Sequence, residues 1–257
     1  MKINKRRDTI SRYARQIILP EVGGAGQKKL AGARVLLVGA GGLGAPAALY
    51  LAAAGVGTLV LVDNDVVDLS NLQRQILHFT RDVGKAKVLS AREKLIALNP
   101  GVKVLVKKTR FTPANAGRLL AGCDLALDGS DNFETRYALN RACMALGVPL
   151  VWGAVLRWGG QIMSVLPGQS ACYECLFPEM PDPALAQSCT NAGIMGSVAG
   201  TIGSLMATEA LKILLAKGDA LTGRLWIMDL LKMALRERRV SRRANCSACG
   251  RKTRPRR

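Results

Sequence analysis

The stretch 35–65 constrains the fold more than any other part of the sequence. Residues 35–38 form an apolar run typical of a buried parallel strand, and glycines in a G-x-G-x-x-G spacing follow directly. An Ala- and Leu-rich segment, 46–54, favours a helix, and a second apolar run, 58–62, ends at Asp63. This order of strand, glycine turn, helix, strand and acid predicts a βαβ unit that binds a nucleotide.

The glycine turn contains the residues expected to lie against phosphate groups. Glycines let the backbone approach an anion closely, and a helix N-terminus offers unpaired N–H groups and a partial positive charge. Asp63 follows the second strand, where a carboxylate can accept hydrogen bonds from ribose hydroxyls, and Asp65 is a second candidate for ribose or magnesium. The glycines concerned are Gly39, Gly41, Gly42 and Gly44.

Cationic and acidic side chains further along the chain indicate a triphosphate site. Arg74 lies in a long polar connection, 65–79, and can reach phosphates at the glycine turn. Lys87 lies early in the next expected helix, where its ammonium can act as a point charge on a triphosphate. Asp131 follows a further strand and can hold magnesium between phosphates. Together these groups suit phosphoryl or nucleotidyl transfer.

Alternating strand-like and helix-like segments predict an α/β fold. We expect a Rossmann-like, mostly parallel central sheet flanked by helices, with an antiparallel extension and a zinc-pinned C-terminal segment. The segments expected are helices at 8–19, 46–54, 84–98, 113–121, 132–146 and 197–215, strands at 35–38, 58–62, 102–107, 125–128, 149–154, 161–166 and 225–228, and a loop at 23–26.

A single domain is expected over residues 1–250. It divides into an N-terminal helical arm (1–33), a nucleotide-binding half (34–148) and a second half that carries the metal site (149–250). The remaining residues, 251–257, are predicted to form a disordered basic tail.

The net charge of +19 is concentrated at the two ends of the chain. Residues 1–34 hold nine Lys/Arg and two acids, and residues 232–257 hold eleven and one, whereas the remainder is close to balance. Such ends suit an acidic protein partner, nucleic acid or a solvated tail. Because no aromatic residues interleave with the tail arginines and no nucleic-acid motif is present, we do not expect nucleic-acid binding.

The sequence indicates neither secretion nor a membrane span. The basic N-terminus lacks the apolar region of a signal peptide. The uncharged stretch 191–208 is short and rich in Gly, Ser and Thr, and Glu209 and Lys212 follow it, so we expect a buried or interface helix. Seven cysteines without a secretion signal favour a reducing compartment, and we predict a cytoplasmic protein.

Two C-x-x-C pairs predict a metal centre. Four thiolates complete a tetrahedral zinc site, which would be closed and therefore structural rather than catalytic. Two redox-active dithiols are the alternative. The pairs are Cys172 with Cys175 and Cys246 with Cys249.

These ordered motifs make the sequence similar to the ThiF/MoeB/HesA family, the bacterial relatives of ubiquitin-activating enzymes. The resemblance spans residues 8–250. It rests on the segments 12–19, 39–44, 63–65, 69–75, 83–87 and 128–132, on both cysteine pairs, and on 192–193.

The resemblance implies ATP-dependent adenylation of a small ubiquitin-like sulfur-carrier protein at its C-terminal Gly-Gly carboxylate. Pyrophosphate would be released, and the carrier would be prepared for thiocarboxylation in thiamine or molybdopterin biosynthesis, with sulfur from a separate donor protein. Asn71 and Gln75 would orient phosphates or the acyl group, and Asn132 belongs to the same nucleotide-binding set. Arg15 would reach into the other subunit's site of a homodimer.

Three alternatives stay open. Cys189 can form a covalent link to the carrier, as the matching residue does in some relatives, or it can be a buried loop cysteine. The same glycine turn and Asp63 also suit an NAD-dependent oxidoreductase. Finally, the chain can be a non-catalytic relative that docks a carrier without adenylating it.

Overall fold

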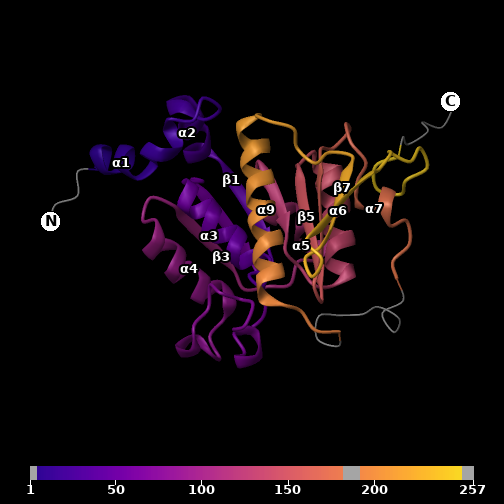
Figure 1. Ribbon diagram of the computed structural model, residues 1–257, viewed down its shortest axis with the longest axis horizontal. Helices are drawn as coiled ribbons and strands as arrows, with labels where there is room; N and C mark the ends of the chain where they lie inside the picture. The colour runs from indigo at the N-terminus through magenta and orange to yellow at the C-terminus, as the bar shows by residue number, and fades with distance from the viewer. Residues whose placement is uncertain (1–4, 182–191, 251–257) are drawn as a thin grey trace.

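The computed structural model describes residues 5–181 and 192–250 and places one eight-stranded sheet at the centre of the protein (Figure 1). The strand order is β3-β2-β1-β4-β5-β6-β7-β8. The strands are β1 (Arg34–Val38), β2 (Thr58–Val62), β3 (Lys103–Lys107), β4 (Leu125–Asp128), β5 (Leu150–Leu156), β6 (Gly159–Val165), β7 (Arg224–Asp229) and β8 (Ala234–Arg239).

The sheet has a parallel half and an antiparallel half. Strands β1 to β5 pair in parallel, and β6, β7 and β8 pair antiparallel to their neighbours. The predicted mostly parallel sheet with an antiparallel extension is confirmed. Because the carboxyl ends of parallel strands meet at one edge, the residues that follow β1, β2 and β4 come together there.

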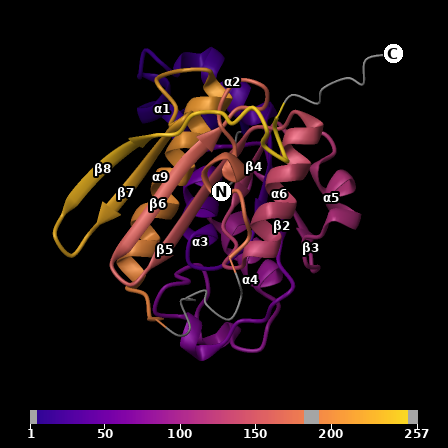
Figure 2. The same cartoon turned by 90° about the vertical axis from the view of Figure 1, so that its right-hand side faces the viewer.

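Helices cover both faces of the sheet (Figures 1 and 2). Two apolar cores result, one beneath α3 and α9 and the other, which also contains aromatic side chains, beneath α5 and α6. The helices are α1 (Lys5–Ile17), α2 (Gly23–Gly32), α3 (Gly44–Ala54), α4 (Lys87–Leu98), α5 (Pro113–Leu120), α6 (Phe133–Leu146), α7 (Tyr173–Leu176) and α9 (Gly196–Leu215).

Helix α9 is apolar and long enough to cross a membrane by length and composition alone. It instead packs on α3, β5 and β6, and its residues Ile202 and Met206 are completely buried. The small residues of α9 permit this close packing, since a Cβ on Gly203 would lie 2.4 Å from the carbonyl oxygen of Leu43. The predicted buried helix is therefore confirmed.

Two segments differ from the sequence prediction. The expected loop at 23–26 is the start of α2, where Gly26 packs against Leu215 of α9 at a distance that leaves little room for a side chain. The hairpin strand β8 was not predicted, because its residues are all exposed and four of its six are charged. Backbone pairing with β7 holds β8 in place, and β8 forms the outer edge of the sheet (Figure 2).

Candidate functional site

A cavity of about 760 Å³ opens at the carboxyl ends of the parallel strands. The glycine turn after β1, the acids after β2 and β4, and the start of α4 all contribute to its wall. Ten residues proposed from the sequence for nucleotide binding line this cavity: Gly39, Gly41, Gly42, Asp63, Asp65, Arg74, Gln75, Lys87, Asp131 and Asn132.

The glycines of the turn have different physical roles. Gly39 has a φ of +89°, and a Cβ there would lie 2.6 Å from the carbonyl oxygen of Gly129. A Cβ on Gly44 would lie 1.9 Å from the carbonyl oxygen of Gly39, so Gly44 serves close packing and does not line the cavity. Gly41 and Gly42 present their backbone to the cavity itself.

Backbone donors fix the Asp63 carboxylate at the end of β2. Its Oδ2 accepts a hydrogen bond from the Ala40 N–H at 2.8 Å, and its Oδ1 accepts one from the Asp65 N–H at 2.8 Å. A carboxylate has about four lone-pair sites, so two fixed donors still leave capacity for the hydroxyls of a ribose. The hydrogen bond from Ala40 joins the glycine turn to Asp63, so the two parts of the site have fixed relative positions.

Lys87 forms an ion pair across the cavity wall. Its Nζ lies 2.9 Å from Oδ2 of Asp65, and its side chain is only 8% exposed, whereas that of Asp65 is 59% exposed. The Asp65 carboxylate can give way to a phosphate, because it is exposed and water can solvate it when the ion pair opens. Lys87 is thus a sheltered cation at the start of α4 that is available to an anionic ligand.

The connection 65–79 turns sharply around Asn71. Asp68 and Asn71 form a reciprocal cap on the short helix η1 (Leu69–Asn71), and the Asn71 side chain does not line the cavity. The guanidinium of Arg74 donates to the carbonyl oxygen of Ser70 at 3.1 Å and borders the cavity. The neighbouring Gln75 is buried beside Gly41, and its Oε1 has no hydrogen-bond partner in the described structure.

The segment after β4 places one acid in the interior and one at the cavity. Asp128 is buried and accepts hydrogen bonds from the N–H and hydroxyl of Ser130, and burial raises its pKa. Asp131 is exposed at the cavity, and its carboxylate makes no hydrogen bond or ion pair with the residues that the structure describes. Asn132 caps α6 by accepting a hydrogen bond from the Thr135 N–H at 2.9 Å.

The chemistry of Asp131 fits a magnesium ion. Magnesium in phosphate sites is commonly held by one or two carboxylates together with phosphate oxygens and water. A single exposed carboxylate that faces the same cavity as Lys87 and Arg74 matches that donor set.

Arg110, Arg136 and Trp152 are among the cavity residues that were not selected from the sequence as site residues. Arg110 follows β3, so the strand-end rule that selected Asp63 and Asp131 could have found it. Arg136 is buried on α6 and donates to the carbonyl oxygen of Ser130 at 2.9 Å. Trp152 is 1% exposed, and its indole Nε1 has no partner within the described segments.

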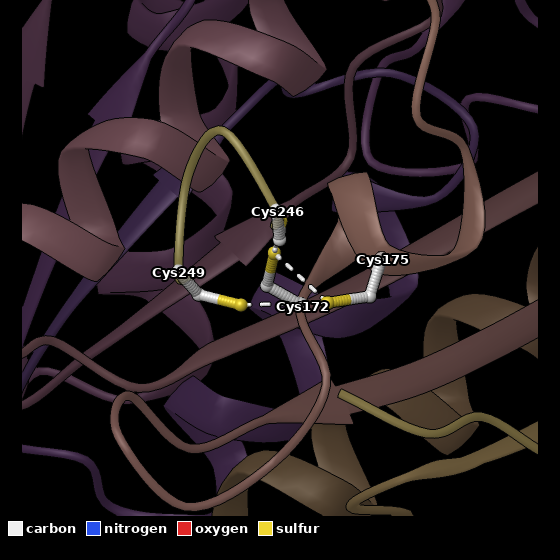
Figure 3. Close-up of side chains that lie close together, drawn as sticks. All are labelled: Cys172, Cys175, Cys246 and Cys249. Carbon is white, nitrogen blue, oxygen red and sulfur yellow. Dashed lines mark hydrogen bonds between the residues drawn. The ribbon is translucent and has the colours of Figure 1, made fainter. Parts of the chain in front are cut away.

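Four buried cysteines converge on one point (Figure 3). Their sulfur atoms all lie within 4.8 Å of one another, with 3.6 Å between Cys172 and Cys246 and 3.4 Å between Cys175 and Cys249. A tetrahedral zinc site with Zn–S bonds of about 2.3 Å requires sulfur–sulfur separations of about 3.8 Å, so the cluster fits zinc. Two independent redox dithiols would have no reason to converge, so the meeting of both cysteine pairs at one point favours a shared metal ion.

Polar groups around the cluster orient its ligands. The side-chain amide of Asn140 donates to the sulfur of Cys172 at 3.6 Å, and the N–H of Arg243 donates to the sulfur of Cys175 at 3.4 Å. The buried Glu174 accepts hydrogen bonds from Arg141 on α6 and from Ser247, at 2.7 Å. These contacts tie the C-terminal segment to α6 and α7.

Arg15 and Cys189 are the remaining site residues predicted from the sequence. Arg15 is exposed on α1 and does not line the cavity of its own chain. Cys189 and the predicted basic tail, 251–257, are outside the described residues.

Nearly the whole chain matches one protein family and several relatives. A model of the ThiF family matches residues 13–248. The sulfur carrier protein adenylyltransferase of Thermus thermophilus is 47% identical over 249 residues, which cover 95% of this chain and 92% of that protein. The SAMP-activating enzyme E1 of Haloferax volcanii is 47% identical over 241 residues, which cover 94% of this chain and 89% of that protein.

Longer relatives and a solved structure extend the comparison. The probable adenylyltransferase/sulfurtransferase MoeZ of Mycobacterium tuberculosis is 47% identical over 234 residues, and the match covers 90% of this chain but 60% of that protein. The crystal structure of E. coli MccB with ATP superposes with a TM-score of 0.82 at 22% identity, covering 93% of this chain and 74% of that one. This structural likeness supports the same fold.

Proposed function

The chain belongs to the ThiF family, and on that premise we propose that it adenylates the C-terminal Gly-Gly carboxylate of a small ubiquitin-like sulfur-carrier protein. One observation carries the proposal: the glycine turn, Asp63, Lys87 and Asp131 line one cavity. A ribose acid, sheltered cations and a magnesium-type carboxylate suit a nucleoside triphosphate. The sulfur carrier as substrate is inferred from the names of the relatives.

The proposed reaction gives each of these groups a role. Asp63 would accept hydrogen bonds from the ribose, and the N–H groups of the glycine turn would face the phosphates. Arg74 and Lys87 would neutralise charge that develops as the carrier carboxylate attacks the α-phosphate and pyrophosphate leaves. Asp131 would hold magnesium, which supplies further charge neutralisation when bound. An acyl-adenylate on the carrier is the product.

The direct test is pyrophosphate exchange. Purified protein mixed with ATP, magnesium and a carrier that ends in Gly-Gly should incorporate labelled pyrophosphate into ATP only when the carrier is present. A carrier truncated by its last glycine is the matched control, since it keeps the docking surface and lacks the correct terminus. Folded, zinc-loaded protein that binds NAD tightly and shows no exchange with any such carrier would instead favour the oxidoreductase interpretation.

We further propose that the active form is a homodimer in which Arg15 enters the partner's cavity. The proposal is supported by the exposure of Arg15 and by its absence from the cavity of its own chain. Its guanidinium would stabilise the phosphates as they react, in the manner of an arginine finger.

A mixing experiment tests this delivery between subunits. Arg15→Ala and Lys87→Ala are each expected to be inactive, but a re-equilibrated equal mixture should recover about a quarter of the wild-type activity. The reason is that about half of the dimers are mixed, and each holds one cavity with both residues intact. Recovery is absent if Arg15 serves its own cavity. Co-purification of untagged Lys87→Ala with affinity-tagged Arg15→Ala after mixing measures subunit exchange independently of activity.

The adenylated carrier would then be thiocarboxylated by sulfur from a separate donor protein in the cytoplasm, in thiamine or molybdopterin biosynthesis. If Cys189 acts as a nucleophile, its thiolate would attack the carbonyl carbon of the acyl-adenylate and displace AMP, which leaves the carrier linked to Cys189 as a thioester. Mass spectrometry of the carrier that co-purifies with the tagged chain assigns the pathway. The same experiment without reductant, on the wild type and on Cys189→Ala, detects or excludes the covalent complex, which only the wild type could form.

A further inference from the structure

His78, the only histidine of the chain, lies buried beneath the glycine turn. Its Nε2 is 3.0 Å from the carbonyl oxygen of Ala40, and its Nδ1 is 2.9 Å from the hydroxyl oxygen of Ser90. A carbonyl oxygen only accepts hydrogen bonds, so Nε2 must carry the proton. In the neutral ring, Nδ1 therefore accepts from the hydroxyl of Ser90. The two contacts select one tautomer.

The contact with His78 sets the orientation of the peptide between Ala40 and Gly41. All described peptide bonds are trans, so the Ala40 carbonyl and the Gly41 N–H point in opposite directions. The carbonyl points to His78, which does not line the cavity, whereas Gly41 does. The Gly41 N–H makes no hydrogen bond in the described part of the chain. It is a free donor on the cavity side of the turn.

The other side of Ala40 is fixed as well. Its N–H donates to Oδ2 of Asp63 at 2.8 Å. The N–H and the carbonyl of Ala40 are thus both paired with buried or half-buried side chains, one directly after β2 and one in the connection before η2 (Thr80–Asp82). Without the donor from His78, the buried carbonyl would lose its partner, which costs free energy that a rotated peptide can recover.

From this geometry we infer that His78 is a positioning residue, which holds the Gly41 N–H toward the phosphates by hydrogen bonding to the Ala40 carbonyl as a neutral Nε2–H donor. The inference deepens the proposed function, because it assumes that phosphates bind at the glycine turn. No atom of His78 needs to touch the substrate.

The surroundings of His78 keep its ring neutral. Burial lowers the pKa of His78, and the ammonium groups of Lys87 and Lys94 act in the same direction, while the Ala40 carbonyl and Asp82 oppose them. Lys94 donates to Ser90 at 2.9 Å and forms an ion pair with Asp82, so α4 and η2 surround the ring with a fixed set of partners. Lowering the pKa of a histidine means that the neutral donor persists as the pH falls below the usual value of about 6.5.

Nitrogen NMR tests the tautomer directly. Because the chain has one histidine, ¹⁵N-histidine labelling of the full-length protein gives a single imidazole. We expect a protonated Nε2 and an unprotonated Nδ1 at neutral pH, retained to a lower pH than in the unfolded chain. A protonated Nδ1 with a bare Nε2 would overturn the inference, because such a ring cannot donate to Ala40.

Binding of tripolyphosphate and of ATP to two variants tests the role. His78→Leu removes the donor and should weaken both ligands about tenfold, while His78→Gln, whose amide can donate to Ala40, should stay within about threefold of wild type. The Gly41 amide resonance should shift on adding tripolyphosphate to wild type and His78→Gln but not to His78→Leu. Equal affinity of wild type and His78→Leu, or no rescue by glutamine, overturns the inference.

The outcomes separate this inference from the proposed function. Weaker tripolyphosphate binding by His78→Leu without carrier-dependent exchange in wild type would preserve the positioning role and refute the adenylation. Exchange in wild type that His78→Leu leaves unchanged would do the opposite. If the leucine variant does not fold, the tautomer in the wild-type protein still decides.

Discussion

Replacing Asp131 by asparagine is expected to lower carrier-dependent pyrophosphate exchange by about a thousandfold, as removal of one group that stabilises transition-state charge does in other enzymes. The carboxylate of Asp131 faces the cavity and makes no hydrogen bond or ion pair with the described residues, so its charge is available to magnesium. Asparagine keeps the size and removes the charge. The exchange rate at saturating ATP and magnesium measures the effect.

The binding of ATP should change far less than the rate. Lys87, Arg74 and the glycine turn are untouched by the substitution, so the dissociation constant measured by calorimetry should rise by about tenfold or less. Glu134→Gln is the matched control, because this carboxylate lies in the first turn of α6 but does not line the cavity. Equal losses in both variants, or full activity in Asp131→Asn, would contradict the assigned role.

The parallel half of the sheet could be predicted because its signals are local. The runs that became β1 and β2 are buried on both faces, and no charged residue interrupts them before Asp63. Strands of this kind must run parallel and be covered by helices. The strand-end rule then brought Asp63 and Asp131 to one edge without any knowledge of long-range contacts.

The elements that escaped prediction depend on partners far away in the sequence. Helix α2 begins with two glycines and has a third at Gly26, which local preference assigns to a loop, yet that glycine allows close contact with Leu215. Strand β8 is charged and wholly exposed, so no apolar alternation marks it. Its pairing with β7 and the 2.9 Å hydrogen bond from Trp226 to Glu237 define it instead.

The same distinction applies to the site. The charge and order of Arg74 and Lys87 sufficed to select them, but the sequence could not show that the Asn71 side chain is used in a cap on η1. It also gave no reason to place the only histidine under Ala40, because that contact joins positions 38 residues apart. Hydrogen bonds of side chains within turns, and between distant parts of the chain, leave no periodic pattern in the sequence from which they could be predicted.

Removing one cysteine of the four-cysteine cluster is expected to have the second large effect. If the cluster holds zinc as proposed, Cys249→Ala should lose about one ion per chain and lower the free energy of unfolding by about 3 kcal/mol or more. The segment 240–250 is held by the cysteine cluster, by the hydrogen bond of Ser247 to Glu174 and by that of Arg242 to the carbonyl oxygen of Cys249. All three contacts involve residues 246–249. Metal analysis and thermal unfolding measure both losses.

The segment 240–250 contains trypsin cleavage sites, so proteolysis reports whether this segment is held in place. Trypsin should cut after Arg242 and Arg243 much faster in Cys249→Ala or after chelation, because release of the cysteine pair exposes this backbone. Cys123→Ala is the matched control: Cys123 is also buried but lies outside the cluster, so zinc content should be unchanged. Trypsin resistance in a protein shown to be free of metal would contradict a structural role for zinc.

Loss of zinc should reach the cavity through α7. This helix carries Cys175 of the metal centre and also Tyr173, which lines the cavity and packs edge-on against Trp152 with ring centroids 5.1 Å apart. The glycine turn and Lys87 lie on other elements, so tripolyphosphate affinity should be preserved while carrier-dependent exchange falls. If metal-free protein keeps its exchange rate, α7 holds its position without zinc. Neither the α7 wall of the cavity nor the phosphate-binding wall would then depend on the metal.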